Sequence, residues 1–468
     1  MFLKSDFLKV QGDKIVNQKG EIVRLRGFCL GGYLHMENFM VGYPGHETGM
    51  REAISNALGV ARAEYFFEEY RKHFFTEEDV KFIRSLGCNT IRVALNYREF
   101  ESDENPFKYK ETGFKRLDQL IGWTRKHRLY VILDLHAIQG WQNGGWHSDN
   151  YTNAALFWGQ KVFEDRAVAL WEEIARRYQG QEFVAGYNLV NEPNTTEIKW
   201  LNQYYERVTH AIRKIDPDHI LFYEGNRDSQ QFDGLKHPFD DNAVYSSHLY
   251  VLPGVEVGKY PGDFDGVYYD RERLKSEYES RREFSQHRGV PHWLGEFGSI
   301  YSEPALDDSR LRVMADMLNI IEEFGDHWTI WNYKDIELMG VVSPKKDSEW
   351  MRTTEPVRKV KTALRCDHWI ERKMAVIDAS IETLSRQVLS VIGELPGNWE
   401  RFAEQIQWRI CDGLISQNLQ PAFASQFQGV TDVDIDWLMK SFSLEECARK
   451  EGLINLIKTV TTGEKENE

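Results

Sequence analysis

The stretch Tyr130-Val131-Ile132-Leu133-Asp134-Leu135-His136 (YVILDLH) decides the fold of this chain, because a nearly continuous apolar run leads there into polar side chains. Such runs are typical of strands that are buried on both faces in a parallel sheet. Similar short β-rich runs recur along the chain and alternate with longer helical patterns. The eight candidate strands are Val23–Phe28, Thr90–Ala94, Tyr130–Leu135, Ala185–Val190, Ile220–Tyr223, Val244–Ser247, His292–Gly295 and Trp328–Trp331.

Helical patterns fill the gaps between these strands. Thr76-Glu77-Glu78-Asp79 has the N-cap and acidic first turn that begin a helix, and Gly87 ends it. The pattern over Thr196–Ile215 is a second helix, stopped by Asp216-Pro217. Eight such βα units without a glycine-rich phosphate loop favour an α/β protein with a closed (β/α)8 TIM barrel over a doubly wound sheet.

Two regions extend this barrel near the N-terminus. Lys9–Val16 and Glu21–Arg24 flank the turn-forming segment Asn17–Gly20 and predict a small hairpin that plugs the bottom of the barrel. The first βα loop, from Cys29 to Thr76, is unusually long and crowded with aromatic residues, and Ala53–His73 within it has a helical pattern. Loops of this length are usually functional or carry their own secondary structure, so we expect a folded lid.

The character of the chain changes after Leu364. We interpret residues 1–364 as a catalytic barrel that includes the hairpin and the lid insertion 29–76, and residues 365–468 as a C-terminal helical extension. The expected helices lie over Ile370–Ile392, over Trp399–Leu419, and over Ser443–Thr461 after a capping box at Ser443–Glu446. We expect the extension to brace the barrel, with a wall of the site or a dimer interface as alternatives. The aromatic residues that suggest a large buried surface are Trp369, Trp399, Trp408 and Trp437.

The composition excludes several classes of function. The chain has 468 residues with a formal net charge of −15, which disfavours binding to nucleic acid or to anionic lipid. No stretch approaches the roughly 20 apolar residues of a membrane span. The five cysteines are scattered without a CxxC pair, and the first nine residues lack the apolar core of a signal peptide. We therefore expect a cytoplasmic protein with free thiols.

Polar or ionisable side chains stand at the end of strand after strand. These residues are Arg92, Asp134, His136, Asn191, Glu192, His248, Tyr250, Glu296 and Trp331. Each one alone has an ordinary structural explanation as an ion-pair partner, a buried imidazole or a rim charge. Because the carboxyl ends of barrel strands converge on one mouth, their joint occurrence predicts an active site there.

Two carboxylates dominate this set. Glu192 lies in Asn191-Glu192-Pro193 at the end of the fourth strand, and Glu296 lies in Gly295-Glu296-Phe297-Gly298 at the end of the seventh. These strands face each other across an eight-stranded barrel, so both side chains can point into one cleft. A facing carboxyl pair that titrates as a coupled system serves glycoside hydrolysis, with the groups about 5 to 6 Å apart in the double-displacement mechanism.

The motifs NEP, GEFG, DLH at the third strand, HLY at the sixth and the final tryptophan together resemble the family-five glycoside hydrolases, retaining enzymes of the cellulase-related clan. The resemblance covers roughly residues 10–364. It implies that Glu192 is the general acid/base and that Glu296 is the nucleophile. It also implies that Asn191 binds the sugar 2-hydroxyl, that Tyr250 touches the nucleophile and that Arg92 keeps the nucleophile ionised.

The resemblance implies further contacts to the sugar. His136 and His248 match the imidazoles that line the sugar site, and Trp331 matches the aromatic platform beneath the ring. Trp141 and Trp146, in the segment QGWQNGGWH, are candidates for further subsites, because aromatic faces suit the C–H faces of pyranose rings. Simple packing within the loop is the alternative for both tryptophans.

The chain departs from the family pattern in its third strand and its lid. The segment Asp134–Gly140 lacks the proline often found there, and with Gln142-Asn143-Gly144 it looks closer to the exo-glucanase and endoglycoceramidase-like branches. We also expect no cofactor and no metal, since no HxH or HExxH spacing is present and Asp134, His136 and His147 alone do not suggest a zinc site.

The resulting hypothesis is a retaining β-glycosidase that acts by double displacement on a carbohydrate substrate. We expect exo-action on short β-glucosides, with mannosides and glycolipid headgroups as less favoured substrates, because the lid should turn a groove into a pocket. The alternatives are an endo-β-1,4-glucanase, a non-catalytic carbohydrate-binding barrel, and a transglycosylase that shares the covalent intermediate.

Overall fold

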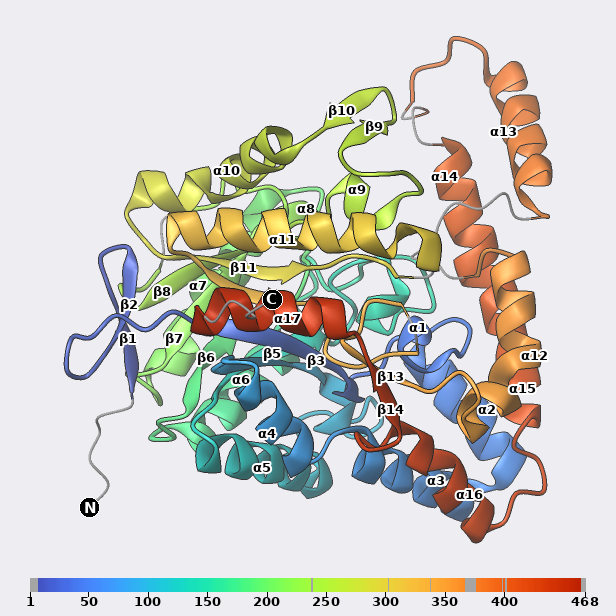
Figure 1. The fold of residues 1–468 in the computed structure, drawn as a ribbon, viewed down its shortest axis with the longest axis horizontal. Helices are drawn as coiled ribbons and strands as arrows, with labels where there is room; N and C mark the ends of the chain where they lie inside the picture. The colour runs from blue at the N-terminus through green and yellow to red at the C-terminus, as the bar shows by residue number, and fades with distance from the viewer. Residues whose placement is uncertain are drawn as a thin grey trace.

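The structure is a computed structural model that describes residues 7–236, 239–301, 303–336, 338–366, 376–397, 399 and 402–463. Eight parallel strands form a closed barrel in the order β11-β12-β3-β4-β5-β6-β7-β8, which confirms the predicted (β/α)8 fold (Figure 1). The barrel strands are β3 (Arg26–Leu34), β4 (Thr90–Asn96), β5 (Tyr130–Ala137), β6 (Val184–Asn188), β7 (Ile220–Glu224), β8 (Ala243–His248), β11 (His292–Phe297) and β12 (His327–Ile330).

A ring of helices covers the barrel. The helices that follow the strands are α4 (Glu77–Ser85), α5 (Glu111–Lys126), α6 (Lys161–Tyr178), α7 (Ile198–Arg213), α10 (Arg271–Arg288), α11 (Asp307–Phe324) and α12 (Glu349–Ala363). After β7 the segment α8 (Asn226–Ser229) is instead a short left-handed turn, in which the φ angles of its last three residues lie between +52° and +61°. The expected helix start at Thr76 is confirmed, because Thr76 and Asp79 form a reciprocal capping box. Shorter elements in the loops are η2 (Tyr97–Glu99), η3 (Trp146–Ser148), α9 (Leu252–Val255), β9 (Gly262–Phe264), β10 (Val267–Tyr269), η4 (Pro304–Leu306) and β13 (Val342–Pro344).

The N-terminal segment closes the bottom of the barrel. Strands β1 (Leu8–Gln11) and β2 (Lys14–Asn17) pair through a turn at Gly12-Asp13, so the hairpin turn expected at residues 17–20 was placed wrongly. The 17–20 segment instead makes a second turn, after which Ile22 bridges Val16. Leu8 and Ile15 pack in one cluster with apolar residues from the first halves of five barrel strands, which confirms the plug.

The insertion in the first βα loop is folded. Strand β3 continues to Leu34, so the insertion runs from His35 to Thr76. It contains α1 (Asn38–Val41), α2 (Glu47–Leu58) and α3 (Val60–Phe74). The single helix expected over 53–73 is in fact two helices that meet at Gly59. The φ of Gly59 is +78°, a backbone conformation that residues with a side chain rarely adopt.

The C-terminal extension differs most from the expectation. Its elements are α13 (Asp378–Ile392), α14 (Phe402–Gln407), the π-helix η5 (Trp408–Ile415), α15 (Ser416–Ser425), α16 (Asp432–Met439), η6 (Lys440–Phe442), β14 (Cys447–Arg449) and α17 (Glu451–Thr462). The capping box expected at Ser443–Glu446 begins no helix, because strand β14 follows it directly. In this region a capping box is formed instead by Thr431 and Asp434, at the start of α16. Trp437 is 64% exposed, and Trp369, Ile370 and Met374 lie outside the described residues.

The extension is packed onto the rest of the molecule. Helix α15 contacts α2, α16 lies beside α3, and α17 lies beside α11, as Figure 1 also shows. Strand β14 pairs antiparallel with β13 from the last βα loop of the barrel. Buried residues of the extension, such as Phe427 and Phe442, belong to the same hydrophobic cluster as the barrel and the insertion. Throughout the described ranges, every helix is too short or too polar to cross a bilayer.

Candidate active site

Glu192 and Glu296 come together at the carboxyl end of the barrel. Glu296 lies within β11, and Glu192 follows β6. A carboxylate oxygen of each residue and a ring nitrogen of His248 all lie within 4.8 Å of one another. The Glu296 side chain is 5% exposed, whereas the Glu192 side chain is 14% exposed, so Glu192 is the more accessible of the two. The structure therefore places the two carboxyls as the sequence suggested.

Glu296 is held by a cation and a phenol. Nη1 of Arg92 donates to one of its oxygens, and the Tyr250 hydroxyl donates to the other at 2.8 Å. Burial raises the pKa of Glu296, whereas the neighbouring His248 and Arg92 cations favour its ionised form. Both donors are thus arranged to stabilise negative charge on a carboxylate that the protein has largely removed from water.

Arg92 is fully buried inside the barrel and organises several strand ends at once. Its Nη2 donates to Asn191 Oδ1 at 2.7 Å and to Glu224 Oε1 at 3.1 Å, and it lies 3.2 Å from Asp134 Oδ2. A buried guanidinium needs such compensation, because an unpaired buried charge is strongly destabilising. Sequence reasoning missed Glu224, although its position at the end of the fifth strand was the same signal that identified the other residues.

The backbone of Glu192 is fixed in an unusual conformation. Its φ of +44° lies in the left-handed region, which residues other than glycine rarely adopt. Its N–H donates to Glu224 Oε2 at 2.7 Å, and its carbonyl accepts from Asn143 Nδ2 at 3.0 Å. These bonds on both sides hold the residue in a strained conformation, as is common at functional sites.

Two imidazoles flank the Glu192 carboxylate. His248 Nδ1 lies 2.8 Å from one oxygen, and His147 Nε2 lies 3.0 Å from the other. Burial raises the pKa of Glu192, but the hydrogen bonds from His147 and His248 outweigh burial and lower it. Burial lowers the pKa of His248, but Glu296 and Glu224 outweigh that effect and raise it to about 10. The carboxylates and imidazoles of this cluster therefore titrate together, and the imidazoles hold protons in preference to the Glu192 carboxylate.

His147 is the main residue here that the sequence did not identify correctly, because it was weighed only as a metal ligand. It lies in η3 of the third βα loop, not at a strand end. A β-carbon on Gly145 would come within 2.4 Å of the His147 ring, so the glycine is what lets the imidazole fold back over the chain. The GGWH segment carries this signal, but only the fold shows that it meets Glu192.

Trp331 and His136 form the floor of the site. Their rings are stacked, with centroids 5.1 Å apart and an interplanar angle of 5°. His136 Nδ1 lies 2.7 Å from Asp134 Oδ2, and its Nε2 lies 3.2 Å from Asn191 Nδ2. Trp331 is joined to Asn332 by a cis peptide bond. The floor is thus continuous with the Arg92 network through Asn191.

Trp141 and Trp146 are buried in the loop that carries them. The indole N–H of Trp141 donates to the Asp149 carbonyl at 2.9 Å, and its ring meets Tyr151 edge-on. Trp146 is 4% exposed and packs edge-on against Phe39. These contacts are typical of loop packing, and the assignment of both residues to further subsites stays a prediction.

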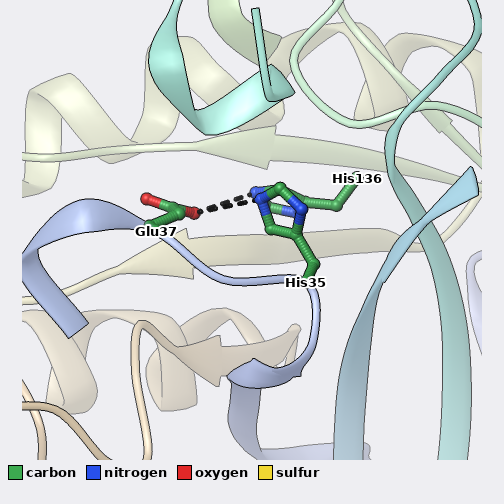
Figure 2. A group of neighbouring side chains, drawn as sticks. All are labelled: His35, Glu37 and His136. Carbon is green, nitrogen blue, oxygen red and sulfur yellow. Dashed lines mark ion pairs between the residues drawn. The ribbon is translucent and has the colours of Figure 1, made fainter. Parts of the chain in front are cut away.

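Two clusters bring histidine and carboxylate ligand atoms within 4.8 Å of one another among the described residues. One is the carboxylate pair with His248. The other comprises His35, Glu37 and His136 and draws on the first βα loop and β5 (Figure 2). Sequence reasoning missed His35 and Glu37, because a single HxE in a long loop is uninformative until the fold brings it against the site.

The chain is similar to a known protein family and to several known proteins. The family model described as cellulase (glycosyl hydrolase family 5) matches residues 48–336. A β-xylosidase from Phanerodontia chrysosporium is 36% identical over 467 residues, with 96% of each chain covered. Endoglucanase C from Acetivibrio thermocellus is 25% identical over 319 residues, covering 59% of this chain and 89% of that protein.

The solved structures show the same fold. An endoglucanase from the hyperthermophile Thermotoga maritima superposes with a TM-score of 0.51 at 18% identity, covering 70% of this chain and 93% of that one. At this identity, the likeness concerns the barrel architecture alone.

Proposed function

The chain belongs to glycoside hydrolase family 5, the cellulase family, and is therefore an O-glycosyl hydrolase; from this premise we propose that it is a retaining, exo-acting β-glycosidase. The observation that carries the proposal is the approach of the Glu192 and Glu296 oxygens to within 4.8 Å. Retaining enzymes hold their two carboxyls about 5 to 5.5 Å apart, whereas inverting enzymes need about 6.5 to 9.5 Å to admit a water.

In the proposed first step, an oxygen of Glu296 attacks the anomeric carbon of the substrate and forms a covalent glycosyl-enzyme. The bond between that carbon and the leaving oxygen breaks, and Glu192 passes to this oxygen a proton that it draws from the imidazoles hydrogen-bonded to it. Arg92 and Tyr250 support the role of Glu296 as nucleophile, because both donate to its oxygens and so stabilise the carboxylate until it attacks.

In the second step, Glu192 removes a proton from water, and the resulting hydroxide attacks the anomeric carbon on the face left by the aglycone. The sugar is released with its original anomeric configuration and Glu296 is regenerated. The two imidazoles next to Glu192 support this exchange of roles, because they can stabilise it in its carboxylate form between the steps.

For the substrate, we propose short β-xylosides first and β-glucosides second. The 36%-identical β-xylosidase, whose match covers 96% of both chains, supports xylosides ahead of the glucosides expected from the sequence. The endoglucanase match covers 59% of this chain, and it supports endo-β-1,4-glucanase activity as the second candidate.

The test follows the anomeric proton of the first product by NMR during hydrolysis of 4-nitrophenyl β-xyloside and β-glucoside. We expect the β-anomer to appear first and to mutarotate later. An α-anomer as first product would contradict retention. Faster hydrolysis of soluble β-1,4-glucan than of the short glycosides would favour the endoglucanase instead.

We also propose a cytoplasmic location. All five cysteines are buried and are not joined in disulfides, which suits a reducing compartment. Cell fractionation with an antibody against the native protein tests this, and accumulation in the culture medium would contradict it.

A further inference from the structure

Glu224 is a buried carboxylate at the end of β7 that neither step of the proposed mechanism uses. It is fully buried. Its backbone is fixed from behind by Tyr205 of α7, whose hydroxyl accepts from the Glu224 N–H at 3.0 Å and donates to the Glu224 carbonyl at 2.9 Å. A buried carboxylate is costly unless it is paired, so the groups around it indicate its role.

The hydrogen bonds to the Glu224 carboxylate all come from donors. Oε1 accepts from Arg92 Nη2 at 3.1 Å. Oε2 accepts from the Glu192 N–H at 2.7 Å and from the Ser229 hydroxyl. An ionised carboxylate only accepts hydrogen bonds, whereas an amide would turn its NH₂ group against Arg92 or against the Glu192 N–H. The surroundings therefore require an ionised glutamate at this position.

The left-handed turn α8 brings Ser229 back to Glu224. The φ angles of its last three residues lie between +52° and +61°, a conformation that residues with a side chain rarely adopt. The turn is also bonded to the segment that follows Glu192, because Asn226 Nδ2 donates to the Thr195 carbonyl at 2.9 Å. Backbone strain of this kind is common at functional sites, and here it supports the carboxylate that holds Glu192.

Glu224 also faces the imidazole that contacts Glu192. His248 Nδ1 lies 2.8 Å from Glu192 Oε1, and His248 Nε2 lies 3.6 Å from Glu224 Oε1. Both ring nitrogens thus face carboxylate oxygens, and only the doubly protonated imidazole presents a hydrogen to each. The charged groups around His248 are Glu192 after β6, Glu224 of β7 and Glu296 of β11, with Arg92 of β4, Asp134 of β5 and Asp228 of α8 farther away.

Arg92 does not by itself account for Glu224. The guanidinium already has two other carboxylate partners, since Asp134 Oδ2 lies 3.2 Å from its Nη2 and its Nη1 donates to Glu296. What distinguishes Glu224 from these partners is that its second oxygen holds the Glu192 N–H. Its position is therefore explained by the acid/base side of the site.

We propose that Glu224 is the positioning residue of the acid/base, which fixes the backbone of Glu192 and keeps His248 as the imidazolium from which Glu192 draws its proton. The inference rests on the proposed function and deepens it, because it names the group that controls the proton on Glu192. In the first step, the proton on His248 Nδ1 passes through the Glu192 carboxyl to the leaving oxygen, and His248 becomes neutral. In the second step, the proton that Glu192 removes from water returns to His248.

The experiment compares the kcat/KM values of wild type and Glu224→Gln on phenyl β-xyloside and on 2,4-dinitrophenyl β-xyloside. We expect E224Q to lose about 10²-fold on the phenyl substrate, which needs protonation, and less than about tenfold on the dinitrophenyl substrate. The basic limb of its kcat/KM profile should move to lower pH, because the neutral amide no longer favours the His248 imidazolium. Glu206→Gln on the exposed face of α7 is the matched control and should behave as wild type.

NMR of protein with ¹⁵N-labelled histidine measures the protonation of His248 directly, and His248→Gln identifies its signals. In the wild type, both ring nitrogens should be protonated at neutral pH, and E224Q should lower the midpoint of the titration. Glu224→Asp keeps the charge but shortens the side chain. It should leave the midpoint near that of the wild type and still lose more activity on the phenyl than on the dinitrophenyl substrate.

The outcomes separate positioning from a purely structural role. Equal losses by E224Q on the two xylosides, with an unchanged basic limb and an unchanged His248 titration, would overturn the proposal. If the melting temperature shows that E224Q is unfolded, E224D decides instead, and equal losses on the two xylosides would again overturn it. A wild type that hydrolyses neither β-xylosides nor β-glucosides would defeat the proposed function, whereas the His248 titration would still report whether Glu224 holds the imidazolium.

Discussion

The site has a half built on strands and a half built on loops, and the two are fixed by different means. Arg92 and Glu296 belong to barrel strands, so the parallel register determines where their side chains converge. His35, Glu37 and His147 belong to the first and third βα loops, whose paths depend on contacts with other parts of the chain. The strand ends therefore place the two carboxylates, whereas the loops bring further imidazole and carboxylate groups against them.

The loop half is held together through Asp149 and the C-terminal extension. Asp149 of the third loop accepts from the N–H and the hydroxyl of Thr48 in α2, at 2.7 and 2.6 Å. Gln417 Nε2 donates to the Tyr151 carbonyl at 2.8 Å, and Gln420 Nε2 donates to the His46 carbonyl at 2.9 Å. Helix α15 therefore ties both loops to one support.

The largest effect is expected in the strand half, on replacing Glu296 by alanine. We expect kcat to fall by about 10⁴-fold or more, because the covalent intermediate can no longer form. Added azide should restore part of the turnover with an activated aryl glycoside and give a glycosyl azide of inverted configuration. Steady-state kinetics with Glu52→Ala as control measures this, and a variant with more than a tenth of the wild-type rate would contradict the assignment.

Glu192 stands between the two halves, since the strand end places it and the loop residue His147 contacts it. Glu192→Gln should lower kcat/KM by about 10² to 10⁴-fold for poor leaving groups, which need protonation. For 2,4-dinitrophenyl glycosides the loss in kcat/KM should be far smaller. A leaving-group series measures the contrast, and an equal loss across the series would rule out general acid catalysis by Glu192.

The support of the loop half is probed by Phe442→Ala. Phe442 is fully buried and packs edge-on against Tyr70 and Trp350, so its removal should lower the free energy of unfolding by about 3 to 5 kcal/mol. Trp437→Ala, at a position that is 64% exposed, should change it by less than about 0.5 kcal/mol. Denaturant unfolding measures both, and equal stabilities would show that the extension is not part of the common core.

The smallest effect is expected for His147→Gln. The His147 hydrogen bond is one of the causes that lower the pKa of Glu192, so its loss raises that pKa. The acid form of Glu192 then persists to higher pH, so the basic limb of the kcat/KM profile should move to higher pH. Wild-type and H147Q profiles on one aryl glycoside measure it; an unchanged or downward-shifted limb would contradict the role.

The sequence predicted the strand half well for a physical reason. Buried parallel strands leave nearly continuous apolar runs, and the residues after them, such as Asn191 and Glu296, must face the mouth. Glu224 obeys the same rule, because it is the last residue of β7. The loop half leaves no such pattern: His35 and His147 reach the site through contacts with α2 and the Gly145 turn, which have no local signature.

The extension shows where sequence patterns mislead. Ser443–Glu446 has the composition of a capping box, yet the pairing of β14 with β13 determines its structure. Trp437 suggests burial by its size, but it lies on the outer face of α16, whereas Ile435 and Leu438 face the core. In both cases tertiary pairing outweighs a local propensity.

The pairing of β14 with β13 has a consequence for synthesis on the ribosome. Strand β13 ends at Pro344, whereas its partner begins at Cys447. At about 5 to 20 residues per second, the nascent chain needs roughly 5 to 21 s to supply that partner. During this interval the edge of β13 and the face of α11 that α17 later covers are open to chaperones and to neighbouring nascent chains.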